Sequence, residues 1–250
     1  METKLTITKM KTTLHKAENR GFANHGWLQA NHSFSFANYY DPEKVHFGAL
    51  RVLNDDIIAP KMGFGTHPHN NMEIVTIPLS GVLKHRDSMN NTWEFVLPGE
   101  VQVMSAGTGV EHAELNGSEE DYLSLFQLWI LPSKQQVAPR YDQKKFDAAG
   151  RKNKLQLLVT SFNDKDKESL KIYQEATLSR IDLDSDRTFT YSLKNKNNGV
   201  YMMNIQGEIT VEGNELNGRD AIAISNTKSF TMSAQESSEL LFIEVPMINL

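Results

Sequence analysis

Residues 73–104, EIVTIPLSGVLKHRDSMNNTWEFVLPGEVQVM, contain several short segments that are typical of β-strands. These are residues 73–79 (EIVTIPL), 92–97 (TWEFVL) and 100–104 (EVQVM), which are rich in β-branched and aromatic side chains. Gly81 and Pro98-Gly99 supply turn signals between them. Short strands with turns at this close spacing predict a β-barrel or a β-sandwich.

Segments on both sides of this stretch have the same character: residues 45–53 (VHFGALRVL), 122–131 (YLSLFQLWIL), 154–159 and 187–193. A helical period is visible only weakly, over residues 143–150. The chain of 250 residues has a hydrophobic fraction of 39%, enough for one large domain or two smaller ones. We therefore expect an all-β protein.

A faint repeat relates the two halves of the chain. Each half contains two glycine turns and a later strand closed by proline, at Gly81, Gly99 and Pro132 and again at Gly207, Gly218 and Pro246. The repeat predicts two β-barrels in tandem, residues 1–135 and 136–250, although two turns and a strand also recur by chance.

The histidines are placed unevenly between these halves. All eight lie at or before position 112. Aligning Gly81 with Gly207, and Gly99 with Gly218, puts the non-ligating residues Leu193, Asn195, Thr231 and Ser233 opposite His67, His69, His112 and Glu114. We expect the first half to carry ligand-type side chains that the second half lacks.

His67-Pro68-His69 and His112-Ala113-Glu114 are both i, i+2 pairs. Alternate residues of an extended chain point to the same face, so we expect both pairs to aim into one barrel and to face each other across it. Three imidazoles and a carboxylate suit a divalent metal ion and leave coordination positions open. A lone histidine is more often a surface or hydrogen-bonded core residue, but the two spaced pairs are more specific.

Composition excludes several classes of function. The net charge of −5 and the pI of about 5.9 provide no basic footprint for nucleic acid. With no cysteine, disulfides, cysteine-ligated zinc and thiol nucleophiles are excluded. No stretch resembles a secretory signal or a membrane span, so we expect a soluble cytoplasmic protein.

Two longer motifs resemble those of the cupin superfamily, whose fold is a jelly-roll β-barrel. They are residues 65–69 (GTHPH) with Glu73 and Gly81, and residues 98–100 (PGE) with residues 107–114 (GTGVEHAE). Their combination is similar to the pirin family of bicupins. Residues 25–27 (HGW), 33–36 (SFSF), 40–42 (YDP) and 54–56 (NDD) resemble its bacterial, quercetin 2,3-dioxygenase-like branch. The likeness is dense over residues 26–132 and looser beyond.

The resemblance implies one metal ion, held in the N-terminal cupin by His67, His69, His112 and Glu114, and a C-terminal cupin without ligands. Iron is the first expectation, with manganese, nickel, copper, cobalt or zinc as alternatives. The implied activity is that of a quercetinase, in which O₂ opens the central ring of a flavonol and carbon monoxide is released. The expected partners are O₂ and a flavonol or another small aromatic enol, with Glu114 as the catalytic base.

Two points stay open at this stage. In many cupins the glutamate of the first motif is a ligand, and Glu73 occupies that place here, but pirins take the carboxylate from the second motif. We therefore assign Glu114 and expect Glu73 to lie in the sheet or beside the ligands. Because eukaryotic pirins act as cofactors of transcription factors, the alternative function is a metal-binding regulatory protein that acts through a protein partner. A structural bicupin with an adventitious metal is a third reading.

Other residues receive weaker expectations. His25 and His32 are expected near the mouth of the site, as packing residues or substrate contacts, and His46 and His85 as structural or exposed residues. Core packing, or the lining of a substrate cavity, is expected for Phe47, Met62, Phe64 and Trp129. Arg51 and Asp55-Asp56 have no role that the sequence indicates.

Overall fold

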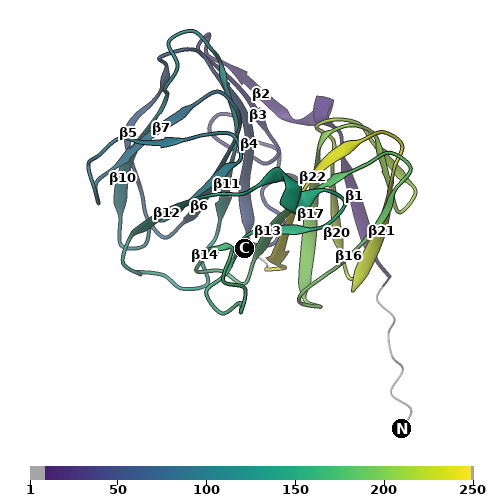
Figure 1. The fold of residues 1–250 in the computed structure, drawn as a ribbon. Helices are drawn as coiled ribbons and strands as arrows, with labels where there is room; N and C mark the ends of the chain where they lie inside the picture. The colour runs from purple at the N-terminus through teal and green to yellow at the C-terminus, as the bar shows by residue number, and fades with distance from the viewer. Residues whose placement is uncertain (1–8, 249–250) are drawn as a thin grey trace.

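The computed structural model describes residues 9–248, and β-strands make up nearly all of their regular structure. The helical segments of this range are two short 3-10 helices, η1 (Ala17–Asn19) and η2 (Ala148–Arg151). Figure 1 shows two β-barrels side by side, one mostly purple to teal and the other mostly green to yellow. The predicted all-β fold with two tandem cupin barrels is confirmed. Neither helix of the described range has the length or apolar character needed to cross a membrane.

The first barrel consists of a seven-stranded sheet and a four-stranded sheet. The seven-stranded sheet has the order β12 (Arg140–Lys145), β9 (Glu100–Ser105), β6 (Glu73–Ser80), β11 (Leu123–Ile130), β4 (Leu50–Ile58), β3 (Leu28–His32) and β2 (Gly21–Asn24). The four-stranded sheet has the order β5 (Gly63–His69), β10 (Val110–Asn116), β7 (Leu83–Asp87) and β8 (Glu94–Val96).

The second barrel repeats this arrangement. Its seven-stranded sheet has the order β1 (Lys11–His15), β20 (Ala221–Ser225), β17 (Asn198–Gln206), β22 (Ser238–Pro246), β15 (Thr177–Leu183), β13 (Gln156–Ser161) and β14 (Leu170–Ile172). Its four-stranded sheet has the order β16 (Thr188–Ser192), β21 (Ser229–Ala234), β18 (Ile209–Val211) and β19 (Asn214–Leu216). Strands β4 to β11 and strands β15 to β22 occupy corresponding places in the same order, which supports an internal repeat.

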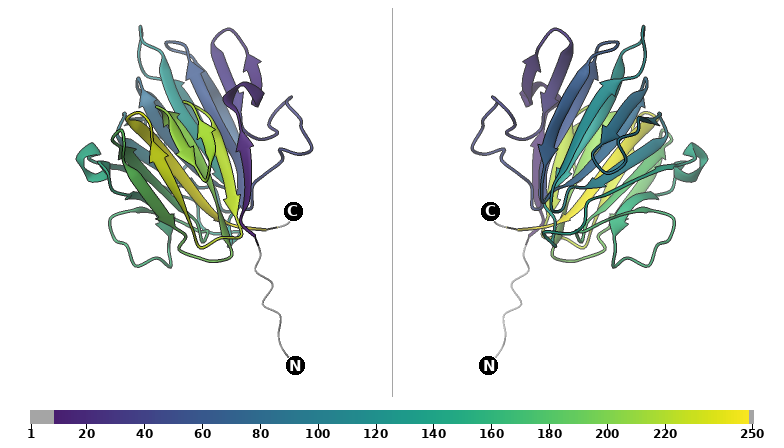
Figure 2. Two further views of the ribbon diagram at one scale, coloured as in Figure 1. Left: turned by 90° about the vertical axis from the view of Figure 1, so that its right-hand side faces the viewer. Right: turned by 90° about the vertical axis from the view of Figure 1, so that its left-hand side faces the viewer.

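The two halves exchange one strand each. β1 comes from the start of the chain but pairs with β20 of the second barrel, and β12 follows residue 135 but pairs with β9 of the first. Figure 2 shows β1, in purple, lying beside the green and yellow strands. The predicted boundary at residue 135 stays a prediction, because strand pairing links the halves across it.

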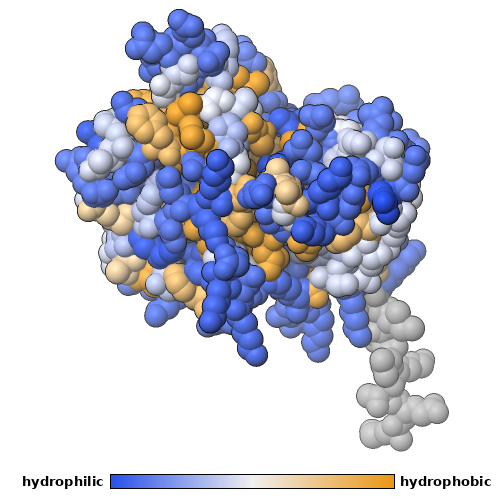
Figure 3. Space-filling view, viewed as in Figure 1, coloured by the Kyte–Doolittle hydropathy of each residue, from blue (hydrophilic) through white to orange (hydrophobic). Residues whose placement is uncertain are grey.

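The largest hydrophobic core lies between the two seven-stranded sheets. It contains buried side chains of both barrels, such as Val75, Phe126 and Leu128 of the first and Tyr201 and Leu241 of the second. Figure 3 shows hydrophobic residues over the first barrel and between the barrels, on a face that is otherwise mostly hydrophilic. This shared core fixes the outer face of β6 and β11, so their alternate residues must point into the first barrel.

Aromatic and aliphatic side chains fill much of the interior of the second barrel. Tyr191 of β16 lies against Phe242, with ring centroids 4.8 Å apart, and against Phe230 of β21 at 5.4 Å. The inward residues of β21 are Phe230 and Met232, whereas Thr231 is exposed. Aligning Thr231 with His112 therefore pairs an outward-facing residue with an inward-facing one, so the alignment is wrong by one residue at this strand. Apolar residues thus occupy the inward positions of β21, and the described residues of the second barrel contain no cluster of three histidine or carboxylate side chains that could hold a metal ion.

Replacing Phe230 with alanine is expected to lower the free energy of unfolding by about 3–5 kcal/mol, because it leaves a cavity within this aromatic cluster. Urea denaturation followed by circular dichroism measures the loss. Phe95→Ala, at a half-exposed side chain on β8, is the control and should cost far less. A cost at Phe230 no larger than at Phe95 would contradict this packing.

Two predicted elements differ from the structure. The strand predicted over residues 45–53 begins at Leu50, because Gly48 adopts a positive φ of 51° and its backbone packs directly against the Pro246 carbonyl. The helix suggested over residues 143–150 is the end of β12 followed by η2. Pairing with β9 overrides the weak helical pattern there.

Candidate metal centre

Three histidines meet inside the first barrel because two neighbouring strands carry them in register. β5 and β10 pair antiparallel, with His67 directly opposite His112. His69 lies on the same face of β5 as His67, as the alternation of a strand requires. The candidate ligand atoms of the three imidazoles all lie within 4.8 Å of one another. The structure therefore brings together three of the four predicted ligands.

The chemistry of these rings fits a divalent metal ion. His112 is 1% exposed, and neither of its ring nitrogens has a hydrogen-bond partner within the described residues. His67 donates from Nδ1 to the carbonyl oxygen of Gly65 at 2.8 Å, which leaves the lone pair of Nε2 free. A buried imidazole without a partner is costly unless a ligand satisfies it, and a metal ion would do so.

The pKa values of the cluster favour neutral, metal-binding rings. Burial, together with the neighbouring His67 and His85, lowers the pKa of His112 to about 3. Burial and the same kind of repulsion from His112 and His67 lower the pKa of His69 to about 4. Both rings are therefore unprotonated at neutral pH and able to donate a lone pair.

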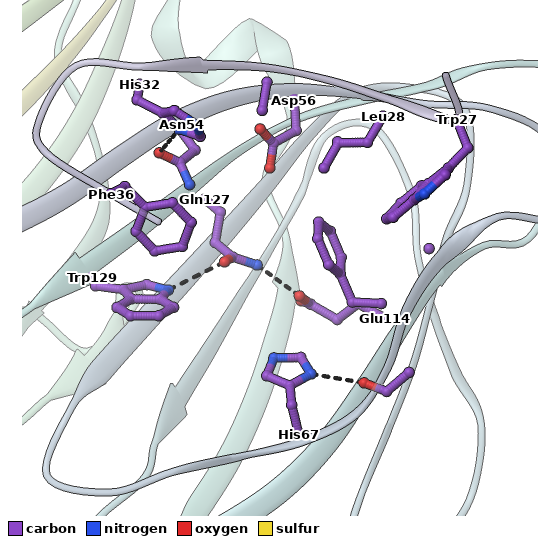
Figure 4. A pocket seen from close by; sticks show the side chains of 14 residues that line it. Trp27, Leu28, His32, Phe36, Asn54, Asp56, His67, Glu114, Gln127 and Trp129 are labelled. Carbon is purple, nitrogen blue, oxygen red and sulfur yellow. Dashed lines mark hydrogen bonds between the residues drawn. The ribbon is translucent and has the colours of Figure 1, made fainter. Parts of the chain in front are cut away.

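Glu114 lies beside this cluster. A β-bulge in β5 places Gly65 and Thr66 opposite Ala113, whereas β10 pairs regularly with β7 through His112 and Glu114, which therefore lie on the same face of β10. The Glu114 side chain is buried and lines the same cavity as His67, as Figure 4 shows. It lies outside the 4.8 Å group of histidine ligand atoms. Its role as the fourth ligand stays a prediction.

A chain of hydrogen bonds fixes the Glu114 carboxylate. Gln127 of β11 donates from Nε2 to Oε2 of Glu114 at 2.6 Å. Thr76 of β6 donates from its hydroxyl group to Oε1 of Glu114 at 3.4 Å. Trp129 donates from Nε1 to Oε1 of Gln127 at 3.1 Å. Because an indole N–H can only donate, this bond sets the orientation of the Gln127 amide. Gln127 therefore positions Glu114.

Replacing Gln127 with leucine is expected to weaken metal binding by about 10–100-fold, the usual effect of losing a partner that orients a ligand. The reason is that the Glu114 carboxylate loses its shortest hydrogen bond. A chelator-competition titration measures the affinity. Ser124→Ala, on the same strand, is the control, and equal affinities for the wild type and Gln127→Leu would remove the positioning role.

A cavity of about 420 Å³ opens beside the centre. Aromatic side chains form much of its wall: Trp27, Phe36, Phe64 and Trp129. Trp27 meets Phe64 edge to face at 5.4 Å, and Phe36 meets Trp129 in the same way at 5.2 Å. Rigid aromatic walls of this kind suit a planar, largely apolar ligand.

Glu73 lies away from the histidine cluster. It begins β6 on the same face as Val75 and Ile77, which belong to the core between the barrels. Ser105 donates to its carboxylate at 2.7 Å, and burial raises the pKa of Glu73 to about 7. Thr76, on the opposite face of β6, is the residue that reaches Glu114. Glu73 is therefore a residue of the sheet.

Of the histidines outside the cluster, His32 alone lines the cavity, and His15 lies on β1 of the second barrel, against Tyr201. His32 hydrogen-bonds Asn54 through Nδ1 at 2.8 Å, whereas His25 is exposed. His46 bonds the Gly48 carbonyl. His85 is buried, lies 5.4 Å from His112 between ring centroids, and stacks on Tyr141 at 4.9 Å. His85 is thus a structural neighbour of the cluster.

Among the apolar residues expected in the core or cavity, Phe64 and Trp129 line the cavity, Phe47 packs against the core between the barrels, and Met62 is exposed. Arg51 donates to the carbonyl oxygens of Ser35 and Val45 and so ties the loop before β4. Sequence reasoning missed Asn54, Asp56 and Gln127, which also line the cavity. The sequence pattern that could have indicated them is a polar residue at an inward-facing position of a mainly apolar strand.

The fold and this site define a bicupin in which, within residues 9–248, one histidine cluster is found, in the N-terminal barrel. Residues 13–130 match the family model described as Pirin, and residues 158–245 match that of the quercetinase C-terminal cupin domain.

Known relatives agree with this class over nearly the whole chain. Quercetin 2,3-dioxygenase of Escherichia coli K12 is 43% identical over 235 residues, which are 94% of this chain and 99% of that protein. A pirin-like protein of Caulobacter vibrioides is 42% identical over 224 residues, 90% and 95% of the two chains. The bacterial pirin YhhW of E. coli, solved in complex with nickel(II), superposes with a TM-score of 0.89 at 40% identity and covers 95% of this chain and 100% of its own. The chain belongs to the pirin family.

Proposed function

We propose that this protein is a metal-dependent dioxygenase that opens the ring of a flavonol-like substrate with O₂. The observation that carries the proposal is one cavity with aromatic walls, in which His67 of the three-histidine cluster and the Glu114 carboxylate both face the space for a substrate. The name of the E. coli relative, quercetin 2,3-dioxygenase, supports the same reaction class.

The resident metal is proposed to be one divalent ion held by His67, His69, His112 and Glu114, with iron as the first candidate. When bound, such an ion supplies Lewis acidity and, if redox-active, electron transfer. The nickel(II) complex of YhhW supports a divalent ion in the family. Nitrogen and carboxylate donors also accept manganese, copper, cobalt and zinc, so the donor set is permissive.

The protein's own residues supply orientation and proton transfer. The aromatic walls hold a planar ring system against the centre and exclude bulk water. Glu114 is proposed to accept the proton of the substrate's enol hydroxyl, which makes the substrate electron-rich and reactive toward O₂. Gln127 keeps the Glu114 carboxylate in one orientation through the 2.6 Å hydrogen bond.

Oxygen uptake with quercetin tests the proposal. Protein loaded separately with Fe, Mn, Ni, Cu or Co is assayed for O₂ consumption and carbon monoxide release, with His69→Ala treated identically as the control. Uptake by at least one loaded wild-type form, with carbon monoxide released and neither seen with His69→Ala, is the expected result. No uptake with any metal would favour the regulatory role over catalysis.

A further inference from the structure

The segment Asn54-Asp55-Asp56 of β4 sends its side chains to two different places. Asp55 faces the second barrel and forms ion pairs with Arg20 at 3.0 Å and Arg219 at 3.1 Å. Asn54 and Asp56, on the other face of the strand, both line the cavity. Alternation along β4 therefore places one carboxyl group in a structural ion-pair network and the next one in the site.

Asp56 is a buried carboxyl group with one oxygen that has no hydrogen-bond partner among the described residues. It is 2% exposed, and its Oδ1 has no hydrogen bond. Arg20 and Arg219 pair with the adjacent Asp55 and not with Asp56. Leaving such a group without a hydrogen bond costs about 1–3 kcal/mol of folding free energy. The presence of Asp56 at this position therefore calls for a functional explanation.

The surroundings of Asp56 disfavour the ionised form of its carboxyl group. Burial, together with the neighbouring Asp55 and Glu114 carboxylates, raises the pKa of Asp56 to about 8. A neutral carboxyl group can donate one hydrogen bond and accept others, so it can pair with a hydroxyl group in either sense.

The position of Asp56 in the cavity sets it apart from the metal centre. Figure 4 shows its carboxyl group pointing into the cavity from the wall opposite His67, beyond Glu114. Ala30 of β3 stands directly across from Asp56 in the sheet and lines the same cavity with only a methyl group. Leu28 and Trp27 lie on one side of Asp56, and the polar Asn54 and Gln127 lie on the other, so Asp56 stands where the polar and apolar parts of the cavity wall meet.

We propose that Asp56 is a specificity-determining residue whose carboxyl group hydrogen-bonds a ring hydroxyl of the substrate, on the side remote from the histidine cluster. The inference rests on the proposed function, since it assumes an aromatic enol held at the metal end of the cavity. It names the substrate class more narrowly: an aromatic enol with a further hydroxyl group on its ring system. A buried group built to pair with a hydroxyl discriminates against an analogue that lacks it.

Two substrates and three proteins test this assignment. Quercetin is compared with 3-hydroxyflavone, which keeps the enol and the adjacent carbonyl but lacks the other hydroxyl groups. Asp56→Leu is expected to lower kcat/KM for quercetin by about 10–100-fold, mainly through KM, which is the usual effect of losing a strong hydrogen bond. The value for 3-hydroxyflavone should stay within about two-fold. Asp56→Asn, which keeps a donor and an acceptor, should restore most of the preference.

Equilibrium binding of both flavonols is followed by quenching of tryptophan fluorescence. It distinguishes the role of Asp56 in substrate preference from the proposed catalysis. If Asp56→Leu loses the preference for quercetin over 3-hydroxyflavone in binding, and the wild type consumes no O₂, the role of Asp56 is upheld and catalysis is rejected. Turnover of both flavonols with an unchanged preference in Asp56→Leu would reject the Asp56 role and uphold catalysis. Absence of binding by the wild type would reject both. If Asp56→Leu does not fold, Asp56→Ala serves the same comparison, because the preference is a ratio measured within one protein.

Discussion

Replacing His112 with alanine is expected to abolish stoichiometric metal binding, and with it oxygen uptake. The ring is buried between the other two histidines, with centroids 4.4 Å from His67 and 4.9 Å from His69. Losing it removes a proposed ligand, so the loss of affinity should exceed the roughly 10–100-fold that follows from changes around a ligand set. Elemental analysis after loading and dialysis measures the ratio of metal to protein.

His25→Ala is the matched control, because His25 lies in the same barrel but is exposed and outside the cavity. It should bind one ion per chain, as the wild type should. Circular dichroism confirms that both variants fold. Retention of a full equivalent of metal by folded His112→Ala would show that the ion is held elsewhere.

Glu114→Gln is expected to retain much of the metal and to lose most of the turnover. Glutamine has nearly the same shape and still offers an oxygen to the Gln127 donor, but its amide does not accept a proton at neutral pH. A general base contributes about 10²–10⁴-fold to a rate, so kcat with quercetin should fall by that order. The rate and the metal content are measured on one preparation, so that a slower enzyme is not confused with an emptier one.

Glu73→Gln is the control for this substitution, since Glu73 is buried in the same barrel but on the opposite face of β6. Its activity should match the wild type. Full activity of Glu114→Gln would exclude Glu114 as the base, and complete loss of metal from it would assign Glu114 mainly to binding the ion.

The histidine cluster could be predicted from the sequence because it depends on local geometry. The i, i+2 spacing of His67 and His69 fixes a common face once the segment is a strand, whatever the rest of the chain does. The spacing of the motifs placed this pair and His112 in one barrel, but it predicted that they face each other across the interior, whereas they lie on adjacent paired strands, β5 and β10. The missing ligands of the second half were equally visible, although only the structure shows Phe230 and Met232 in their place.

Long-range pairing explains what the sequence did not reveal. β1 and β12 lie in barrels built mainly from distant segments, and no local pattern encodes that exchange. The role of Gln127 depends on contacts with Glu114 and Trp129 on both sides of it, one of them from another strand. Asp55 and Asp56 are adjacent carboxyls that only the sheet separates into an ion-pair residue and a cavity residue.

Anomalous X-ray scattering from crystals of the metal-loaded protein tests the central claim most directly. The account predicts one peak per chain, about 2.0–2.2 Å from nitrogens of His67, His69 and His112 and from a carboxylate oxygen of Glu114. A peak at these histidines without Glu114 would reduce the ligand set to three. A peak in the second barrel, or none at the histidine cluster, would contradict the assignment of a single metal centre to the first barrel.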